Sequence, residues 1–378
     1  EDLTLSNLPN FEDIKNMKKL LLHYGVSFKE DSRKVILNAK NIINKETNYD
    51  IVRKMRASIL ILGPLLSRFK KAKISLPGGC AIGTRPIDIH LLGLEKLGAN
   101  IKIENGFVFA NLKKEMTGNK INLPFPSVGA TENILMASVL AKGKTIINNP
   151  AKEPEIFDLA NSLNLMGANI KGAGTNQIKI EGVSKLNKSS YSVMSDRIVA
   201  GTYIIAAVML NKKFEVKKIN SQYLKALIDL LKKMGANLII KKNSIIILPS
   251  KKLSASKIET KPYPGFPTDL QAQIMALMSI VDGDSVIKET IFENRFMHVS
   301  ELRRMGAQIN VKGNEATIFG IKKLNGAELM ATDLRASVSL VLAGLSANNR
   351  TVVNRVYHLD RGYEKIEKKL RNCGAKIK

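Results

Sequence analysis

The segment best suited to chemistry is the stretch from Leu76 to His90, which reads LPGGCAIGTRPIDIH. Its three glycines and two prolines predict a long mobile loop. Within it, Cys80 carries a thiol that solvent can reach and that the positive charge of Arg85 makes easier to ionise. Such a thiol could act as an acid or a nucleophile. The residue types alone also allow an incidental small residue at this position.

Three arginines occupy equivalent places near the start of a predicted helix. Arg85 and Arg361 each stand 13 residues before a repeated glycine, and Arg295 stands 11 before another (98 − 85, 374 − 361 and 306 − 295). A cation there opposes the helix dipole, whereas a bound phosphate or carboxylate would contact both the guanidinium and the free N–H groups. The pattern favours an anion site over the alternative, a surface arginine paired with a nearby carboxylate.

Three aspartates follow a Ser or Thr where a buried helix is expected to begin: Asp196, Asp269 and Asp333. This placement is ordinary chemistry for a helix N-terminus, and it suffices to explain Asp196. Asp269 differs because the preceding segment PYPGFP, residues 262–267, forms a stiff loop that would fix its carboxylate at the edge of a domain. A carboxylate held in this way could take a proton from a hydroxyl group.

These residues are positioned by a unit that occurs six times. In each copy an apolar residue and a glycine close a helical pattern, and successive glycines stand 68 to 73 residues apart (235 − 167 and 98 − 25 are the extremes). A glycine just past a helix readily adopts the left-handed conformation that ends it. The copies are Tyr24-Gly25-Val26, Leu97-Gly98-Ala99, Met166-Gly167-Ala168, Met234-Gly235-Ala236, Met305-Gly306-Ala307 and Cys373-Gly374-Ala375.

Each complete copy combines an amphipathic outer helix, two short strands and a helix that is apolar on all sides. In the fourth copy, the outer helix spans Gln222 to Met234, and the strands span Asn237 to Ile240 and Ser244 to Leu248. The apolar helices have to be buried. They are predicted at Ala57 to Leu66, Glu132 to Leu140, Val199 to Leu210, Leu270 to Ile280 and Leu334 to Leu345.

The repeats predict an α/β protein of two domains, each with three repeats and with apolar helices inside the sheets. The boundary is expected near Tyr191 to Ser195, which gives domains of residues 1–194 and 195–378 and a cleft between them. The aspartates that begin interior helices precede their glycines by 37 to 41 residues (306 − 269 and 374 − 333). The same interval places the first interior helix before residue 1. We therefore expect a truncated first repeat. The 378 residues alone should turn over poorly, and an upstream segment of about 35 to 40 residues should restore activity.

Composition narrows the remaining classes. The 378 residues are 44% hydrophobic, and no apolar run reaches the roughly 20 residues of a membrane span, so we expect a cytoplasmic protein without a membrane partner. Two cysteines and four histidines give neither a disulfide framework nor a metal signature. Cys373 occupies a repeat position that apolar residues hold elsewhere, which predicts a core residue. The net charge of +26 comes mostly from dispersed lysines and favours a solvated surface over a nucleic-acid partner.

Seven segments together resemble the UDP-N-acetylglucosamine enolpyruvyl transferases. They are residues 76–90, 125–133, 196–202, 266–273, 291–298, 331–337 and 358–364. The likeness runs from residue 1 to residue 378, and the Pro-Gly-Gly-Cys loop is specific to this family among its relatives. The resemblance implies an inside-out α/β barrel of two domains, built from six β/α units. It also implies that the domains close on UDP-N-acetylglucosamine before its 3-hydroxyl attacks phosphoenolpyruvate.

The resemblance further implies roles for individual residues. Asp269 would be the base at the 3-hydroxyl, and Cys80 would protonate the methylene carbon of phosphoenolpyruvate or form a covalent adduct with it. Arg85 and Arg361 would hold the phosphate and carboxylate of phosphoenolpyruvate. The positions that would bind the sugar nucleotide or surround the reacting centre are Arg56, Arg85, Pro86, Ile87, Asp88, Ile89, Phe125, Pro126, Ser127, Val128, Ile291, Arg295, Asp333 and Arg335.

The family pattern implies no metal and no organic cofactor, because fixed cations can stabilise the charge that develops in an addition–elimination reaction. Phe125 departs from it, since some members have a basic residue there. The family's Lys-Asn pair would fall in the stretch expected before residue 1. One alternative is the sister enzyme acting on 3-phosphoshikimate, which lacks the Pro-Gly-Gly-Cys segment. Another is a basic nucleic-acid-binding repeat protein, which would show a salt-dependent affinity for DNA or RNA.

Overall fold

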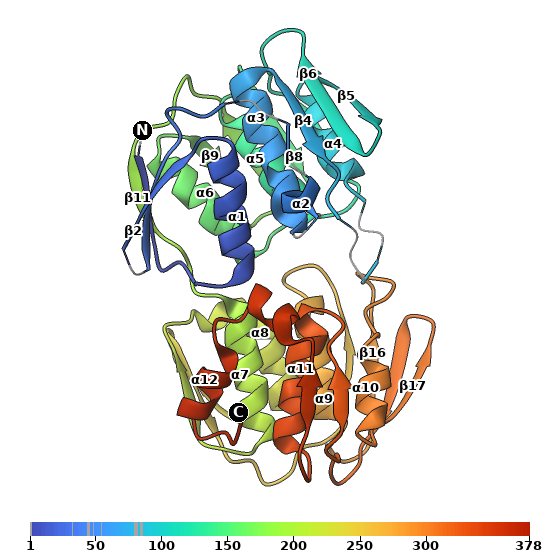
Figure 1. Ribbon diagram of the computed structural model, residues 1–378. Helices are drawn as coiled ribbons and strands as arrows, with labels where there is room; N and C mark the ends of the chain where they lie inside the picture. The colour runs from blue at the N-terminus through green and yellow to red at the C-terminus, as the bar shows by residue number, and fades with distance from the viewer. Residues whose placement is uncertain are drawn as a thin grey trace. The chain divides into compact units, whose positions relative to one another are not determined.

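A computed structural model describes residues 2–31, 33–43, 46–47, 49–53, 55–78, 82–83 and 86–378. The chain forms two compact units. Unit 1 comprises residues 1–80 and 84–194, and unit 2 comprises residues 81–83 and 195–378. Each unit has an extensive apolar core of its own. Figure 1 shows the helices and strands of both units.

The described part of unit 1 contains three small sheets, with strand orders β11-β1-β3-β2, β4-β6-β5 and β7-β8-β10-β9. β1 pairs in parallel with β11, with Leu3 opposite Ser189, so the last strand of the unit returns to its first sheet. The strands are β1 (Asp2–Ser6), β2 (Ser27–Asp31), β3 (Lys34–Asn38), β4 (Lys71–Ser75), β5 (Ala99–Glu104), β6 (Phe107–Leu112), β7 (Lys120–Asn122), β8 (Lys144–Asn148), β9 (Asn169–Lys171), β10 (Gln177–Glu181) and β11 (Ser189–Ser192).

Unit 2 repeats this plan with sheets of order β12-β14-β13, β15-β16-β18-β17 and β19-β20. The two strands predicted for the fourth copy are confirmed with the expected bounds, as β13 and β14. The strands are β12 (Phe214–Lys217), β13 (Asn237–Ile240), β14 (Ser244–Leu248), β15 (Lys257–Glu259), β16 (Asp284–Lys288), β17 (Gln308–Lys312), β18 (Glu315–Phe319), β19 (Glu328–Met330) and β20 (Val352–Asn354).

Apolar helices occupy the inside of each unit, as predicted. In unit 2, α7, α9 and α11 lie side by side (Figure 1), and all eight residues of α9 are buried. The first predicted helix begins as a 3-10 helix, η1 (Arg56–Ile61), and continues as α3. The others are confirmed, and none of the described helices is long and apolar enough to cross a membrane. Their bounds are α3 (Leu62–Phe69), α5 (Val128–Ser138), α7 (Arg197–Met209), α9 (Gln271–Met278) and α11 (Leu334–Ser346).

Six outer helices end at the repeated glycines. Each of these glycines has a positive φ between 90° and 102°, which confirms the predicted left-handed caps. At the end of α8, the N–H of Gly235 donates to Lys232 and the N–H of Ala236 donates to Leu231, the bonding pattern of a Schellman cap. The outer helices are α1 (Glu12–His23), α4 (Asp88–Lys96), α6 (Pro154–Leu165), α8 (Lys225–Lys233), α10 (Val299–Arg304) and α12 (Ile366–Asn372).

The prediction that Cys373 is a core residue is wrong, because its side chain is exposed. At the equivalent position of the fourth copy, Met234 is buried, and two strands follow its glycine. The residues after Gly374 form no strand. The cap at the end of α12 is retained, because the N–H of Gly374 donates to Arg371 and the N–H of Ala375 donates to Leu370.

Candidate active site

The carboxylate of Asp269 is the most unusual polar group of unit 2. It lies in the 3-10 turn η3 (Thr268–Leu270), directly before α9. Oδ1 accepts a hydrogen bond from Arg295 Nη2 at 2.9 Å, and Oδ2 accepts one from Arg335 Nη2 at 3.1 Å. The side chains of Arg295 and Arg335 are 4% and 14% exposed, whereas that of Asp269 is 41% exposed. The carboxylate therefore reaches solvent while two buried cations hold it in place.

Asp269 also differs from the other two aspartates at helix starts. Asp196 and Asp333 each accept hydrogen bonds from the backbone N–H groups two and three residues further on, and so cap α7 and α11. No such bond forms at η3, which begins after Pro267 as a 3-10 turn. The predicted capping role of Asp196 is confirmed. The carboxylate of Asp269 instead accepts hydrogen bonds from Arg295 and Arg335.

The electrostatic environment keeps Asp269 ionised. Burial alone would raise the pKa of its carboxyl group, but the guanidinium groups of Arg335 and Arg295 outweigh that effect and hold the pKa well below its usual range. A carboxylate bound through both oxygens is a weak proton acceptor. Each of its oxygens keeps a second lone pair, however, and a hydroxyl group can still donate to that lone pair.

A buried glutamate, Glu289, supports this arrangement. Its Oε2 accepts a hydrogen bond from Thr268 Oγ1 at 2.9 Å, and its Oε1 accepts bonds from the backbone N–H groups of Ile291 and Phe292. It thereby joins the turn that carries Asp269 to the segment that carries Arg295. Sequence reasoning assigned Glu289 no role, although a carboxylate directly after an apolar strand is a signal that could have found it.

Arg295 is not an exposed cation awaiting an anion. Its guanidinium bonds Asp269 and the carbonyl of Thr268, and it lies 5.6 Å from the centre of the Phe292 ring. Arg295 therefore pairs with a nearby carboxylate, as in the alternative, although its own side chain is buried and not at the surface. α10 begins four residues later, at Val299. The exposed N–H groups of that helix therefore contribute little to the environment of Arg295.

Arg361 lies near a second group of polar side chains in unit 2. It is the last residue of η4 (Val356–Arg361), and it is half-buried. The pKa of His358 is lowered by burial first and then by the charge of Arg361, while Asp333 opposes this effect. Arg361, His358 and Asp333 therefore share one electrostatic environment. His298, which is buried, also senses Asp333 and Arg295, and its pKa falls to about 4 mainly through burial.

In unit 1, four neighbouring helices, η1, α3, α4 and α5, are joined by one buried side chain, Asn133 of α5. Its amide nitrogen donates to the carbonyl of Ile59 in η1 at 3.1 Å and lies 3.2 Å from Nδ1 of His90 in α4. Its amide oxygen accepts from the N–H of Gly63 at 2.8 Å. These contacts hold together the helices that begin beside Arg56, Asp88 and Ser127.

His90 packs between these helices as a neutral ring. Burial, and next the charge of Arg56, lower its pKa to about 4. At Gly129, near the start of α5, an added Cβ would lie 3.1 Å from Cε1 of this ring. The glycine therefore permits the close approach of α4 to α5. Sequence reasoning missed both His90 and Asn133, although a polar residue inside an apolar helix is a signal for such a role.

The remaining predicted residues have varied exposure. Ser127 caps α5 by accepting a hydrogen bond from the N–H of Ala130. Cys80 and Arg85 lie outside the described residues. Pro86, Asp88 and Phe125 are exposed, Ile87 is buried, and Arg56, Ile89, Pro126, Ser127, Val128 and Ile291 are half-buried.

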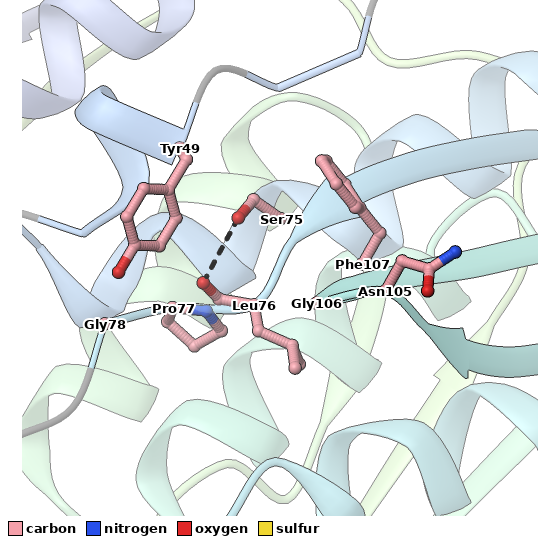
Figure 2. A pocket seen from close by; sticks show the side chains of 8 residues that line it. All are labelled: Tyr49, Ser75, Leu76, Pro77, Gly78, Asn105, Gly106 and Phe107. Atoms are coloured by element: carbon pink, nitrogen blue, oxygen red, sulfur yellow. Dashed lines mark hydrogen bonds between the residues drawn. The ribbon is translucent and has the colours of Figure 1, made fainter.

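A pocket of about 380 Å³ opens in unit 1 where the chain leaves β4 (Figure 2). Tyr49 and Phe107 contribute its aromatic walls, and Ser75 Oγ donates to the carbonyl of Leu76 at 3.4 Å. Its described lining contains no charged side chain and none of the predicted site residues. Three of its lining residues, Leu76, Pro77 and Gly78, begin the segment predicted to carry Cys80.

Comparison with known proteins identifies close relatives. The family model described as EPSP synthase (3-phosphoshikimate 1-carboxyvinyltransferase) matches residues 1–370. The chain is 53% identical over 376 residues to the UDP-N-acetylglucosamine 1-carboxyvinyltransferase of Pelagibacter ubique, and 52% identical over 377 residues to that of Gluconobacter oxydans. Each match covers 100% of this chain and 90% of the relative.

Solved structures share the fold. The enolpyruvyl transferase NikO from Streptomyces tendae has a TM-score of 0.90 at 23% identity, with 100% of this chain and 90% of that chain covered. EPSP synthase from Acinetobacter baumannii has a TM-score of 0.76 at 19% identity, with 100% and 91% covered. At these identities the likeness concerns architecture alone. The predicted α/β fold of enolpyruvyl transferases is confirmed.

Proposed function

The chain belongs to the UDP-N-acetylglucosamine 1-carboxyvinyltransferases, and from this membership we propose that Asp269 is the base of their reaction. The enzyme transfers the enolpyruvyl group of phosphoenolpyruvate to the 3-hydroxyl of UDP-N-acetylglucosamine and releases phosphate. This is the first committed step of peptidoglycan synthesis. The observation that carries the assignment is the carboxylate of Asp269. It caps no helix, and two largely buried guanidinium groups hold it while it stays partly exposed to solvent.

In the addition step, Asp269 takes the proton of the 3-hydroxyl as the sugar oxygen bonds to C2 of phosphoenolpyruvate. The electrons of the double bond take a proton at C3, which we assign to the thiol of Cys80. In the elimination step, C3 returns a proton to the Cys80 thiolate, the double bond forms again, and the bond from C2 to the phosphate oxygen breaks. The proton held by Asp269 passes to the departing phosphate, so both side chains regain their starting state. Phosphate and the enolpyruvyl ether leave.

Fixed cations stabilise the charges of this reaction. We assign Arg85 and Arg361 to the phosphate and carboxylate of phosphoenolpyruvate, because guanidinium groups bind such oxyanions through two hydrogen bonds. Arg295 and Arg335 hold the base, and Asp333 lies in the same electrostatic environment as Arg361. Preorganised donors of this kind lower the barrier without an added metal or cofactor.

The helix starts of unit 1 are the proposed binding site of the sugar nucleotide. Arg56 brings a positive charge, and Ser127 stands at the N-terminus of α5, where N–H groups favour an anion. Pro86 to Ile89 and Phe125 to Val128 would line the same site. The exposed ring of Phe125 offers the uridine an aromatic surface instead of a charge.

We propose UDP-N-acetylglucosamine and phosphoenolpyruvate as the only partners, with no role for nucleic acid or a membrane. Because both substrates are metabolites of the cytoplasm, we place the reaction there.

A phosphate-release assay with alternative acceptors tests this function. Phosphate is expected from phosphoenolpyruvate with UDP-N-acetylglucosamine and not with 3-phosphoshikimate, although the matching family model bears the name of the shikimate enzyme. Each substrate alone serves as the control. Release with 3-phosphoshikimate alone among the acceptors would overturn the assignment.

A further inference from the structure

A closed set of hydrogen bonds surrounds Asp269 from both its side chain and its backbone. Arg335 Nη2 donates to Asp269 Oδ2, and Arg335 Nη1 donates to Tyr363 Oη at 3.2 Å. Tyr363 Oη lies 2.9 Å from Thr202 Oγ1. Gln273 Nε2 then donates to Thr202 Oγ1 at 3.2 Å and to the carbonyl of Asp269 at 2.9 Å. The set joins α7, α9 and α11 and returns to the residue at which it began.

The direction of each bond in this set follows from the protons available. Thr202 Oγ1 donates its single proton to the carbonyl of Ile198 at 2.9 Å, so it can only accept from Tyr363 and Gln273. Tyr363 must therefore donate to Thr202, which leaves its oxygen as the acceptor for Arg335. Each hydroxyl group has one defined role, and neither can rotate without losing a bond.

Burial makes this set rigid. Thr202, Gln273 and Tyr363 are each at most 2% exposed, so water cannot replace a lost bond at these positions. Arg335 also lies against the face of the Tyr363 ring, 5.7 Å from its centre. A guanidinium held by Tyr363 on one side and by Asp269 on the other cannot turn about its long side chain. Leaving one of these buried groups unpaired therefore carries a desolvation cost.

We propose that Tyr363 and Thr202 are positioning residues whose hydroxyl groups orient Arg335, and through it the base Asp269. The inference rests on the proposed role of Asp269. When Asp269 takes a proton, it loses its charge and its hold on Arg335. The bond to Tyr363 then keeps the guanidinium in place until the carboxylate forms again. Thr202 contacts both Tyr363 and Gln273. It therefore also fixes the Gln273 amide, which donates to the carbonyl of Asp269.

Removing the two hydroxyl groups separately tests this proposal in the full chain. Tyr363→Phe should lower kcat by about tenfold, the scale expected when a reacting group is slightly misplaced, and should leave KM for UDP-N-acetylglucosamine within about twofold. Thr202→Val should behave alike, whereas Thr202→Ser keeps the hydroxyl and should keep most of the turnover. Tyr203→Phe is the matched control, because Tyr203 packs against the same small apolar cluster as Tyr363 without joining the hydrogen-bonded set.

Equal turnover in Tyr363→Phe and Tyr203→Phe would overturn the proposal, as would equal losses in Thr202→Val and Thr202→Ser. If Tyr363→Phe does not fold, the two Thr202 variants decide.

A second measurement does not depend on turnover. In a double-mutant cycle of unfolding free energies, Tyr363→Phe and Asp269→Asn should be coupled beyond experimental error, and Tyr203→Phe and Asp269→Asn should not. If the two substitutions are coupled but the wild-type protein releases no phosphate, the proposed function is refuted and the link between Tyr363 and Asp269 stands. Absence of coupling would refute the link.

Discussion

In unit 1, neighbouring helices are joined by the neutral side chains of Asn133 and His90. In unit 2, by contrast, the charged groups of Arg295 and Arg335 hold the carboxylate of Asp269. A neutral amide satisfies backbone groups without altering the charge at a site. Guanidinium groups both orient a carboxylate and shift its pKa. The contrast suits the proposed division in which unit 1 binds the sugar nucleotide and unit 2 holds the base for its 3-hydroxyl. Four predictions test that division.

The largest effect is expected for the carboxylate of unit 2. Asp269→Asn should keep the fold and the binding of UDP-N-acetylglucosamine but lower kcat by about 10² or more, as for other positioned bases. The amide oxygen can still accept a bond from one arginine, so Arg295 keeps a partner. Steady-state phosphate release measures the loss. Asp196→Asn is the control, because asparagine can also cap α7. Near wild-type turnover in Asp269→Asn would remove the proposed base.

A smaller effect is expected at the proposed anion site. Arg361→Ala should raise KM for phosphoenolpyruvate roughly 10- to 100-fold, which corresponds to one charged hydrogen bond of about 1.5–3 kcal/mol. KM for UDP-N-acetylglucosamine should change much less. Initial rates with each substrate varied in turn separate the two constants, with the exposed Arg371→Ala as a control. Equal increases for both substrates would indicate a structural role for Arg361.

In unit 1, the corresponding test removes the buried amide. Asn133→Ala should lower the free energy of unfolding by about 1–3 kcal/mol, because the N–H of Gly63 and the carbonyl of Ile59 lose their partner. KM for UDP-N-acetylglucosamine should rise more than that for phosphoenolpyruvate. Urea denaturation and initial rates provide the two readouts, and exposed Asn122→Ala is the control. If Asn133→Ala acted on phosphoenolpyruvate instead, the proposed division between the units would fail.

The pH dependence of stability gives the smallest of the four effects. The folded pKa of His90 is about 4 against an ordinary 6.5, so the unfolded chain binds the proton more readily in this window. The contribution of the neutral ring is complete above pH 6.5 and is lost as the pH falls toward 4. Between pH 7 and pH 5 the loss should be about 2 kcal/mol.

His298 in unit 2 shares this pH window, so the measurement has to compare wild type with His90→Gln. Urea denaturation at pH 7 and pH 5 should show a smaller loss in His90→Gln. Asp269 affects stability only at lower pH. Its folded pKa lies below the usual range, so its contribution to stability is lost only as the pH falls below the ordinary value near 3.8. Identical losses in wild type and His90→Gln would exclude His90 as the cause.

Local chemistry explains why so much of the fold was predictable. The repeated glycines, the apolar helices and the strands β13 and β14 depend on neighbours within a few residues, which the sequence displays directly. Asp269 was predicted to be unusual because the stiff segment before it, residues 262–267, would fix its carboxylate at the edge of a domain. The roles of Cys80 and Arg85 stay predictions, since both lie outside the described residues.

What sequence reasoning missed depends on partners far apart in the chain. The bonds of Asn133 reach 74 residues back to Ile59, and Tyr363 meets Thr202 across 161 residues. Periodicity gives no information on such pairs. Cys373 shows the opposite limit, because its local pattern matches the other copies although its side chain is exposed. Arg295 is a related case, in which equivalent spacing did not imply an equivalent partner.

The parallel pairing of β1 with β11 has a consequence for how the chain emerges from the ribosome. Leu3 pairs with Ser189, which follows it by 186 positions (189 − 3). The strand pairs described in unit 2 join residues no more than 35 positions apart, as between Asp284 and Phe319. At about 5–20 residues per second, the free edge of β1 is exposed for roughly 10 to 40 seconds during synthesis. An unpaired strand edge is a template for wrong pairing with other chains. During synthesis, β1 of unit 1 therefore stays without its parallel partner for longer than any strand in the pairs described in unit 2.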